Sequence, residues 1–340
     1  MKALIIGGTG TISTAVVAEA AKAGWELWVL NRGRRTDAEL PEGVHPLQAD
    51  FADTDAVLAA IDGLVFDAVA DFIGFDAAHA AQAVRMFTDR TAQYLYISSA
   101  SAYQKPLGDP LVRESTPLSN PLWAYSQKKI ESELLLMEAY RKEGFPVTIV
   151  RPSHTYGRRS IPMGYNGNQG SWQVLERMLQ GKPVLVHGDG TSLWTMTWNG
   201  DFAKGFVGLM GAPRAIGEAV HITSDETLTW NQIYTIVARA LGVEPLLYHV
   251  SSDFIAEFDP SARGALMGDK ATSVIFDNSK IKRLVPGFTC TVRFDQGVRM
   301  CLEHILAHPE CRTPDPAFDI LCDRIIAAQE HAKAEAAPSR

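Results

Sequence analysis

Short apolar runs alternate with amphipathic stretches through the first half of the chain. The runs predict strands at Ala3–Ile6, Glu26–Leu30, His45–Gln48, Ala68–Asp71, Tyr94–Ile97 and Val147–Val150. The stretches between them predict helices near Ile12–Ala23, Asp55–Ile61, Ala77–Thr88 and Pro121–Glu143. Buried strands that alternate with helices imply a parallel sheet covered on both faces, with right-handed crossovers. The predicted fold class is therefore α/β, with a Rossmann-type doubly wound parallel sheet.

The pattern changes after Arg151-Pro152. Glycine, asparagine and serine gather in Gly157–Ser171, which predicts a loop over the carboxyl edge of the sheet. Beyond it, helices are predicted at Trp172–Gln180, Asp201–Met210 and Trp230–Leu241, with strands at Val184–His187, Ala219–Ile222 and Leu246–Val250. We predict a dinucleotide-binding Rossmann domain over residues 1–157, to which segments near 199–222 return. A smaller mixed α/β substrate lobe covers 158–330, and residues 331–340 form a frayed tail.

Composition narrows the class of protein. Hydrophobic residues make up 46% of the chain and charged residues 21%, a balance typical of soluble globular proteins. The net charge of −7 disfavours nucleic acid as a partner, because nucleic-acid binding needs a basic face. Neither a signal peptide nor a membrane span is expected from the apolar runs. The cysteines lack the close pairs of a zinc site, so we expect reduced thiols, no metal and a cytoplasmic protein.

A glycine-rich loop follows the first predicted strand and opens the first predicted helix. Gly7 permits a tight turn, and Gly10 lets the backbone approach a pyrophosphate. The free amide groups around Thr11 and Ile12, at the positive end of the helix dipole, would bind that pyrophosphate. Ser13 occupies the third glycine position, where we expect a slight shift of the helix without loss of binding. The loop predicts a dinucleotide site.

The end of the second strand bears on which dinucleotide is bound. An acidic residue there would bind the adenosine ribose hydroxyls of NAD(H), but the chain has Asn31 and Arg32. Arg32, helped by Arg34 or Arg35, could bind a 2′-phosphate, although a solvated basic loop is the alternative. NADP(H) is thus favoured over NAD(H). Asp50, after the third strand, is a candidate contact to the adenine edge or a cap for the next helix.

A serine, a tyrosine and a lysine at two further places in the chain suggest a site for proton transfer. Tyr125 and Lys129 are four apart, so on a helix they share one face. An ammonium beside a phenol lowers the pKa of the phenol, which makes Tyr125 a candidate general acid or base. Lys129 is also placed to hold a nicotinamide ribose. Ser99 follows the fifth strand, where it could polarise a substrate oxygen for Tyr125.

With these residues the chain resembles the extended short-chain dehydrogenase/reductase superfamily, in particular the NAD-dependent epimerase/dehydratase family. The matching motifs are the glycine loop, Ile97-Ser98-Ser99 with Tyr103, Tyr125 with Lys129, Arg151-Pro152 with Tyr156-Gly157, and Gly188-Asp189-Gly190. The Asn31-Arg32-Gly33-Arg34 run is most similar to the branch of the chloroplast stem-loop-binding proteins. The resemblance implies that Ser99, Tyr125 and Lys129 are catalytic and that the second lobe binds the substrate. It also implies hydride transfer between a substrate carbinol carbon and nicotinamide.

One departure concerns the substrate. Sugar-nucleotide enzymes of this family typically carry an arginine after Gly-Asp-Gly that holds the substrate diphosphate, whereas this chain has Trp194 there. A tryptophan cannot pair with a diphosphate, though it could stack on a sugar. His154 should face the same pocket, as a substrate contact or as a packed, hydrogen-bonded histidine.

Two classes of function remain open at this point. The first is an NAD(P)-dependent oxidoreductase or epimerase of a sugar-like or polyol substrate. The second is a non-catalytic dinucleotide-sensing or RNA-associated protein on the same fold, since fold alone does not settle function. Relatives often dimerise through the helix that carries Tyr125, and Leu134-Leu135-Leu136-Met137 would suit either a homodimer or packing on the sheet.

Overall fold

A seven-stranded sheet forms one end of the molecule in the computed structural model, which describes residues 1–33 and 40–336. The strands lie in the order β12-β7-β5-β4-β1-β2-β3, and every pairing is parallel. Their bounds are β1 Lys2–Ile6, β2 Glu26–Asn31, β3 His45–Gln48, β4 Ala68–Asp71, β5 Tyr94–Ile97, β7 Val147–Pro152 and β12 Ala219–Ile222. Ile6 pairs with Leu30 on one side and with Asp71 on the other, so these strands end at one edge. Ligands of such sheets bind at this edge.

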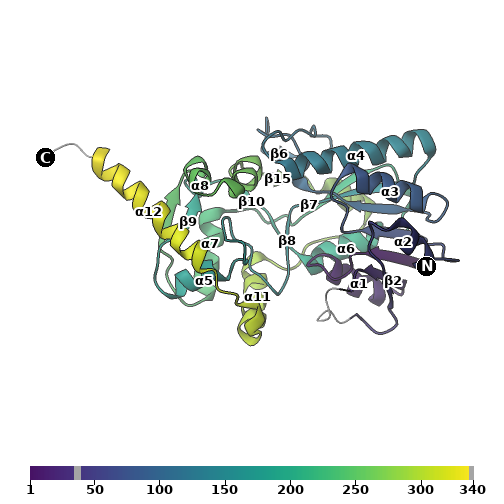
Figure 1. The fold of residues 1–340 in the computed structure, drawn as a ribbon, viewed down its shortest axis with the longest axis horizontal. Coiled ribbons are helices and arrows are strands. Elements are labelled where there is room, and N and C mark those ends of the chain that lie inside the picture. Colours follow the sequence, from purple (N-terminus) through teal and green to yellow (C-terminus); the bar gives the residue numbers. More distant parts are fainter. Residues whose placement is uncertain (34–39, 337–340) are drawn as a thin grey trace.

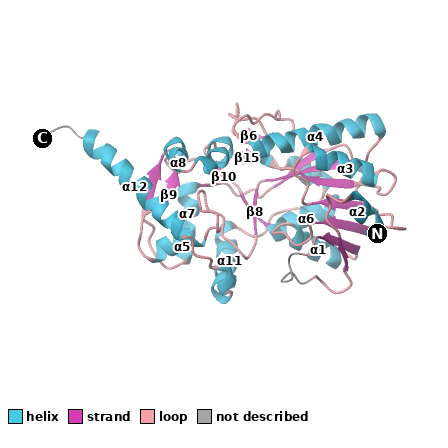
Figure 2. Ribbon diagram, in the orientation of Figure 1, coloured by secondary structure: helices cyan, strands magenta, loops and turns pink. Residues whose placement is uncertain are grey.

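Helices cover both faces of this sheet (Figures 1 and 2). On one face lie α1 (Ser13–Lys22) and α6 (Asn199–Leu209); on the other lie α2 (Thr54–Ala60), α3 (Ala77–Phe87) and α4 (Ala124–Glu143). Each face has its own apolar core, because strands buried on both sides carry apolar residues at successive positions. The predicted fold class is confirmed. The segment that contains α6 and β12 returns to this sheet after an excursion into the other half.

The rest of the chain forms a mixed half with a third apolar core. Its helices are α5 Trp172–Leu179, α7 Trp230–Ala240, α8 Ser252–Phe258, α9 Arg263–Ala265, α11 Phe294–Ala307 and α12 Pro316–Ala336, whereas α10 (Ser279–Leu284) packs with α6 and β12 in the core of the large sheet. Its short strands pair as β6 (Leu111–Val112) with β15 (Ile275–Phe276), β8 (His154–Tyr156) with β11 (Met196–Trp198), β9 (Val184–His187) with β14 (Leu247–Val250), and β10 (Leu193–Trp194) with β13 (Leu228–Thr229). Figure 1 places β8 where the two halves meet. The lobe boundaries given above stay a prediction.

The tail differs from its expectation. Helix α12 continues as far as Ala336, where fraying was expected from residue 331. Phe318, Cys322 and Ile325 lie on one stripe of this helix and are buried, which anchors its first half. Its second half projects from the body at the end opposite the sheet (Figure 1). Residues 337–340 lie outside the described part.

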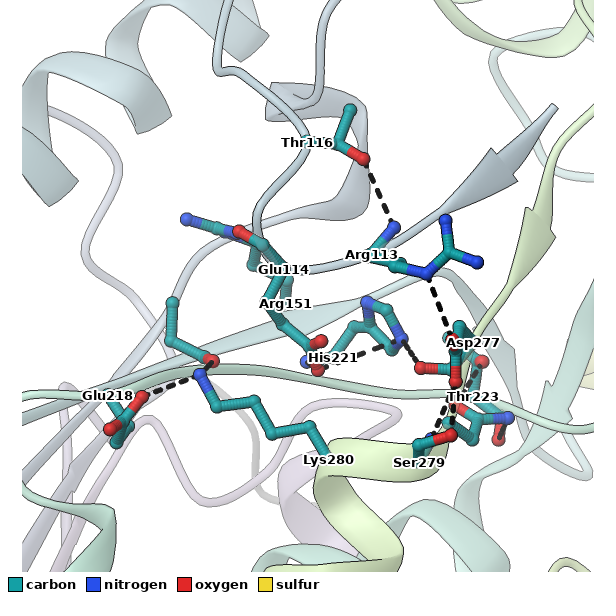
Figure 3. Close-up of polar contacts among 12 residues, drawn as sticks. Arg113, Glu114, Thr116, Arg151, Glu218, His221, Thr223, Asp277, Ser279 and Lys280 are labelled. Atoms are coloured by element: carbon teal, nitrogen blue, oxygen red, sulfur yellow. Dashed lines mark hydrogen bonds and ion pairs between the residues drawn. The ribbon is translucent and has the colours of Figure 1, made fainter. Parts of the chain in front are cut away.

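Buried polar contacts join the edge of the sheet to the second half (Figure 3). The His221 amide on β12 donates to Glu114 Oε1 over 3.2 Å, and its Nε2 bonds to the Asp277 carbonyl at 2.9 Å. Because that carbonyl only accepts, Nε2 carries the proton, and Nδ1 accepts from the Tyr103 hydroxyl at 3.0 Å. Tyr103 therefore braces β12 and does not face a ligand. Lys280 and Glu218 add an ion pair of 2.6 Å (Figure 3).

Candidate active site

A groove with a cavity volume of about 1200 Å³ lies along the carboxyl ends of β1 to β5. The predicted cofactor residues Gly7, Gly10, Thr11, Ile12, Asn31, Arg32 and Asp50 all line it. Ile97 and Thr155 line its far end, towards Lys129 and the second half. The topology brings these residues together, since the ends of neighbouring parallel strands share one edge.

The glycine loop is held in a conformation that only small residues allow. Gly7 has a φ of +80°, and a Cβ there would lie 2.3 Å from Ile73 Cγ2. A Cβ on Gly8 would lie 2.6 Å from Val29 Cγ1. The loop thus packs flat against β2 and the turn after β4.

The Ser13 side chain stabilises this loop through hydrogen bonds. Its hydroxyl accepts from the Gly10 amide at 2.8 Å and donates to the Gly7 carbonyl at 2.7 Å. The slight helix shift expected from this serine is therefore accompanied by two bonds that brace the turn. Helix α1 has no side-chain cap, so the amide groups of its first turn face the groove without a competing side chain. This geometry fits a pyrophosphate.

Two of the cofactor contacts can be described further. Asp50 does not cap the next helix, because Asp53 caps α2 by accepting from the Ala56 amide at 3.0 Å. Asp50 itself accepts from the Ala52 amide at 3.1 Å and borders the groove. Arg32 lies between the main groove and a smaller cavity of about 390 Å³. The predicted helpers Arg34 and Arg35 lie outside the described residues.

Lys129 is anchored at the end of the groove. Its ammonium donates to the Ile97 carbonyl at 2.7 Å and to the Gly74 carbonyl, and it lies 5.9 Å from the centre of the Tyr125 ring. Helix α4 thereby holds Lys129 against the ends of β4 and β5. Burial lowers the pKa of Lys129 to about 8, against the opposing influence of Asp71 and Glu133.

Ser99 lies close enough to Tyr125 to lower the pKa of its phenol. A chain of hydroxyls leads to Ser99, since Ser126 donates to Ser101 at 2.8 Å and Ser101 lies 2.8 Å from Ser99. Either hydroxyl of the Ser99–Ser101 pair can be the donor, and when Ser101 donates to Ser99, the Ser99 proton is available to Tyr125 or to a ligand. Burial raises the pKa of Tyr125, while the Ser99 hydrogen bond lowers it by less. The lowering expected from Lys129 is thus wrong for this structure, because the loss of solvent around the phenol has the larger effect.

His154 and Trp194 contact each other. The Trp194 indole nitrogen donates to His154 Nδ1 at 3.3 Å, and its ring lies 5.4 Å from the Trp230 ring. Trp194 is only 4% exposed, which leaves little of the ring for stacking on a sugar. Burial lowers the pKa of His154 to about 3, so this imidazole is neutral and suited to packing and hydrogen bonding.

Comparison with known proteins identifies the relationship. A model of the family described as "NAD dependent epimerase/dehydratase family" matches residues 3–223. The chain belongs to this family. Its relatives include 2'-dehydrokanamycin reductase of Streptomyces kanamyceticus, 27% identical over 85% of this chain and 80% of the reductase. The chloroplast stem-loop binding protein of 41 kDa b of Arabidopsis thaliana is 27% identical over 76% of this chain and 67% of that protein.

Solved structures share the fold. UDP-glucuronic acid 4-epimerase from Bacillus cereus, in complex with UDP-glucuronic acid and NAD, superposes with a TM-score of 0.71 at 19% identity. The match covers 90% of this chain and 99% of the epimerase. UDP-glucose 4-epimerase from Bifidobacterium longum, in complex with NAD+ and UDP, has a TM-score of 0.74 at 17% identity and covers 92% and 100% of the two chains. Membership of an NAD-dependent family makes a nicotinamide dinucleotide the cofactor of this chain.

Several side chains in or beside the groove were given no site role from the sequence, which left open for Asp71 whether it tunes the site or caps a turn. Asp71, buried at the end of β4, accepts from the Ile73 and Gly74 amides at 2.9 Å and from the Tyr94 hydroxyl at 2.8 Å. Burial alone would raise the pKa of Asp71, but these bonds and His79, 3.0 Å away, lower it overall. Asp71 therefore fixes the turn beside the groove. The His79 ring stacks on Phe51 at 4.0 Å, and both rings line the groove.

Two further observations concern metals and membranes. Within residues 1–33 and 40–336, no group of three or more His, Cys, Asp or Glu side chains is arranged to hold a metal ion. Over the same ranges, none of the helices combines the length and the apolar character that crossing a bilayer requires.

Proposed function

We propose that the chain is an NADP(H)-dependent oxidoreductase that reduces a carbonyl group, or oxidises the corresponding hydroxyl, on a sugar-like or polyol substrate. The observation that carries this proposal is the position of Lys129, which is bonded to the carbonyl of the groove residue Ile97 and has its ammonium 5.9 Å from the centre of the Tyr125 ring. The relatives support the reaction class, since one is named a reductase and the solved structures include epimerases.

The side chains of this chain would act on a proton. In the reductive direction the Tyr125 hydroxyl donates its proton to the substrate oxygen, while the Ser99 hydroxyl donates a hydrogen bond to the same oxygen. The bound nicotinamide supplies or accepts the hydride at the substrate carbon. A raised pKa keeps Tyr125 protonated at neutral pH, so the form that carries the proton needed for reduction is the populated one. Lys129 holds the end of the groove and places its charge beside the phenol ring.

The cofactor preference rests on Arg32. It borders the groove next to Asn31, at the end of β2 where the adenosine ribose of a dinucleotide lies in such folds. A guanidinium there binds a 2′-phosphate through charge-assisted hydrogen bonds. Replacing Arg32 by Ala should weaken NADPH binding about tenfold to a hundredfold and leave NADH binding unchanged. Lys22→Ala, which removes an exposed charge outside the groove, is the matched control. Equal loss of NADPH affinity in both variants would contradict the assignment.

The catalytic roles are tested with Tyr125→Phe. We expect kcat to fall by at least about a hundredfold and the Kd for NADPH to stay within a factor of two, because the ring is kept and only the hydroxyl group that carries the proton is removed. Turnover is followed by nicotinamide absorbance with a panel of ketoses, aldoses and polyols. Tyr248→Phe, on β14, should behave as wild type. Wild-type turnover by Tyr125→Phe would reject the mechanism.

The relative named a stem-loop binding protein supports a second candidate, an RNA-associated role on the same fold. The net charge of −7 weighs against it. Titration of a stem-loop RNA at two salt concentrations decides between the two, since RNA binding through phosphates weakens steeply with salt.

A further inference from the structure

A short segment from the second half, Leu266–Lys270, closes against the start of α4. It forms a π-helical turn, a feature found mostly at functional sites. The Asn120 side-chain amide donates to the Ser101 carbonyl at 2.8 Å and to the Gly268 carbonyl at 2.7 Å. One amide therefore ties this segment to the loop that carries Ser99. The segment lies beside the proposed catalytic hydroxyls.

The approach of the two segments is close. A Cβ on Gly268 would lie 2.9 Å from Trp123 Cβ, and one on Gly264 would lie 2.2 Å from Trp123 Cδ1. The Trp123 ring lies 4.9 Å from the Tyr125 ring. The turn thus packs directly on the residues that position Tyr125.

The backbone of Lys270 is held by three side chains. Its carbonyl accepts from Ser192 Oγ, from Trp230 Nε1 and from His187 Nε2, each at 3.2 Å. These donors come from three different parts of the second half. A residue clamped in this way presents its side chain from a fixed position, as a binding site requires.

Two ammonium groups and only one carboxylate lie on or beside this turn. Lys105, only 4% exposed, has its ammonium 4.0 Å from Asp269 Oδ1. The Lys270 ammonium has no hydrogen-bond or ion-pair partner anywhere in residues 1–33 and 40–336. Lys270 is half-buried, and burial lowers the pKa of both lysines. Two ammonium groups thus share one carboxylate.

The neighbouring histidines do not change this balance. Burial lowers the pKa of His154 to about 3 and that of His187 to about 4, and the charge of Lys270 adds to both effects. Both rings are therefore neutral at pH 7, and Lys270 lies near the two of them. Burial raises the pKa of Asp269 to about 6, so its carboxylate is still mostly ionised at pH 7.

An uncompensated ammonium in a partly buried place is costly unless a ligand brings the opposite charge. The position where sugar-nucleotide enzymes carry their diphosphate-binding arginine is filled by Trp194, packed against Trp230. The positive charges near Asp269 come instead from Lys105 and Lys270, and Asp269 is in turn close enough to Tyr125 to influence its phenol.

We propose that Lys105 and Lys270 bind a single compact anionic group on the substrate, a carboxylate or a phosphate monoester, with Asp269 as the residue that positions Lys105. This inference rests on the proposed function and names its substrate class: a sugar or polyol that carries one anionic group apart from the reacting carbon. A polycationic aminoglycoside does not fit these charges.

The test measures binding by the full chain with NADP+ bound, by isothermal titration calorimetry, in the absence of turnover. The probes are D-glucuronate, D-glucose 6-phosphate, neutral D-glucose and cationic D-glucosamine. We expect at least one anionic probe to bind at least tenfold more tightly than D-glucose, and the carboxylate and phosphate probes to differ in Kd. In Lys270→Met the preference should fall to within twofold, because this change keeps the clamped carbonyl and removes only the ammonium. Lys128→Met, an exposed neighbour on α4, should keep the wild-type preference.

Contrary outcomes are equally plain. The proposal is overturned if D-glucose or D-glucosamine binds as tightly as both anionic probes. It is also overturned if the anion preference survives in Lys270→Met, or if no anion binds at all. Tyr125→Phe separates the two levels, because it should keep the anion preference while losing turnover. If the anion preference holds but no carbonyl compound is ever reduced, the proposed function fails and the anion site stands.

Discussion

Replacing Gly7 by Ala tests how the glycine loop is built. Gly7 adopts a φ of +80°, and an added Cβ would lie 2.3 Å from Ile73 Cγ2. The left-handed backbone costs an L-residue about 1–2 kcal/mol. Forcing a methyl group against a packed side chain costs about 1–3 kcal/mol more. We therefore expect the free energy of unfolding to fall by about 2–5 kcal/mol.

Gly24 provides a matched control. Its φ is +82°, nearly that of Gly7, but no heavy atom lies within 4 Å of a Cβ built there. Gly24→Ala should therefore show only the backbone cost, about 1–2 kcal/mol. The difference between the two variants measures the contact with Ile73. In an Ile73→Ala background, which removes Cγ2, that difference should largely disappear.

Urea unfolding followed by circular dichroism and tryptophan fluorescence gives both free energies. The same variants are titrated with NADPH, whose affinity should fall in Gly7→Ala alone, since a displaced loop carries the amide groups of α1 away from the pyrophosphate. Equal destabilisation by the two substitutions would refute the steric argument. Unchanged NADPH affinity in a folded Gly7→Ala variant would refute the role of the loop.

Three further outcomes are expected. Glu133→Gln should lower the free energy of unfolding by about 3–5 kcal/mol in a urea titration, because Glu133 is the buried partner of Arg151. The Arg151 Nε atom lies 2.9 Å from Glu133 Oε1. A loss below about 1 kcal/mol would contradict this expectation. His187 has a folded pKa of about 4 against an ordinary 6.5, so its contribution to stability is present above pH 6.5 and is lost as pH falls towards 4. That contribution amounts to about 3 kcal/mol, and His187→Asn should flatten stability over this range while the exposed His331→Gln leaves it unchanged. Leu134, 60% exposed on α4, should support a homodimer, so Leu134→Arg should give a monomer by light scattering; a monomeric wild type would contradict the dimer.

The strands of the sheet were predictable almost to the residue. Strands such as Ala68–Asp71 and Tyr94–Ile97 are buried on both faces, so they read as continuous apolar runs ended by turn residues. Strands of two or three residues, such as Leu193–Trp194, carry no period and were missed. Helix α11 was missed despite a usable signal, since Phe294, Val298, Cys301 and Ile305 recur at helical spacing and are buried.

The site was predictable to the extent that topology alone places it. Gly7, Asn31 and Asp50 follow neighbouring parallel strands, so any right-handed doubly wound sheet brings them to one groove. Lys105 and Lys270 follow no such rule. Lys105 lies near the turn that carries Lys270 because that turn, distant in sequence, is tied by Asn120 to the serine loop, and no periodic pattern encodes that contact. Contacts of this kind depend on packing between halves of the chain.

The four-residue spacing of Tyr125 and Lys129 predicts that Lys129 lowers the pKa of Tyr125, and this prediction fails. Four residues on a helix put the two side chains on one face, but the Lys129 ammonium is directed to the Ile97 and Gly74 carbonyls. Those bonds hold the Lys129 ammonium on backbone carbonyls. Burial then has the largest effect on the pKa of Tyr125 and raises it. A phenol that keeps its proton at neutral pH donates more readily than it accepts. Burial thus keeps the protonated form of Tyr125, which reduction needs, populated at neutral pH, whereas oxidation needs the phenolate and should accelerate as pH rises.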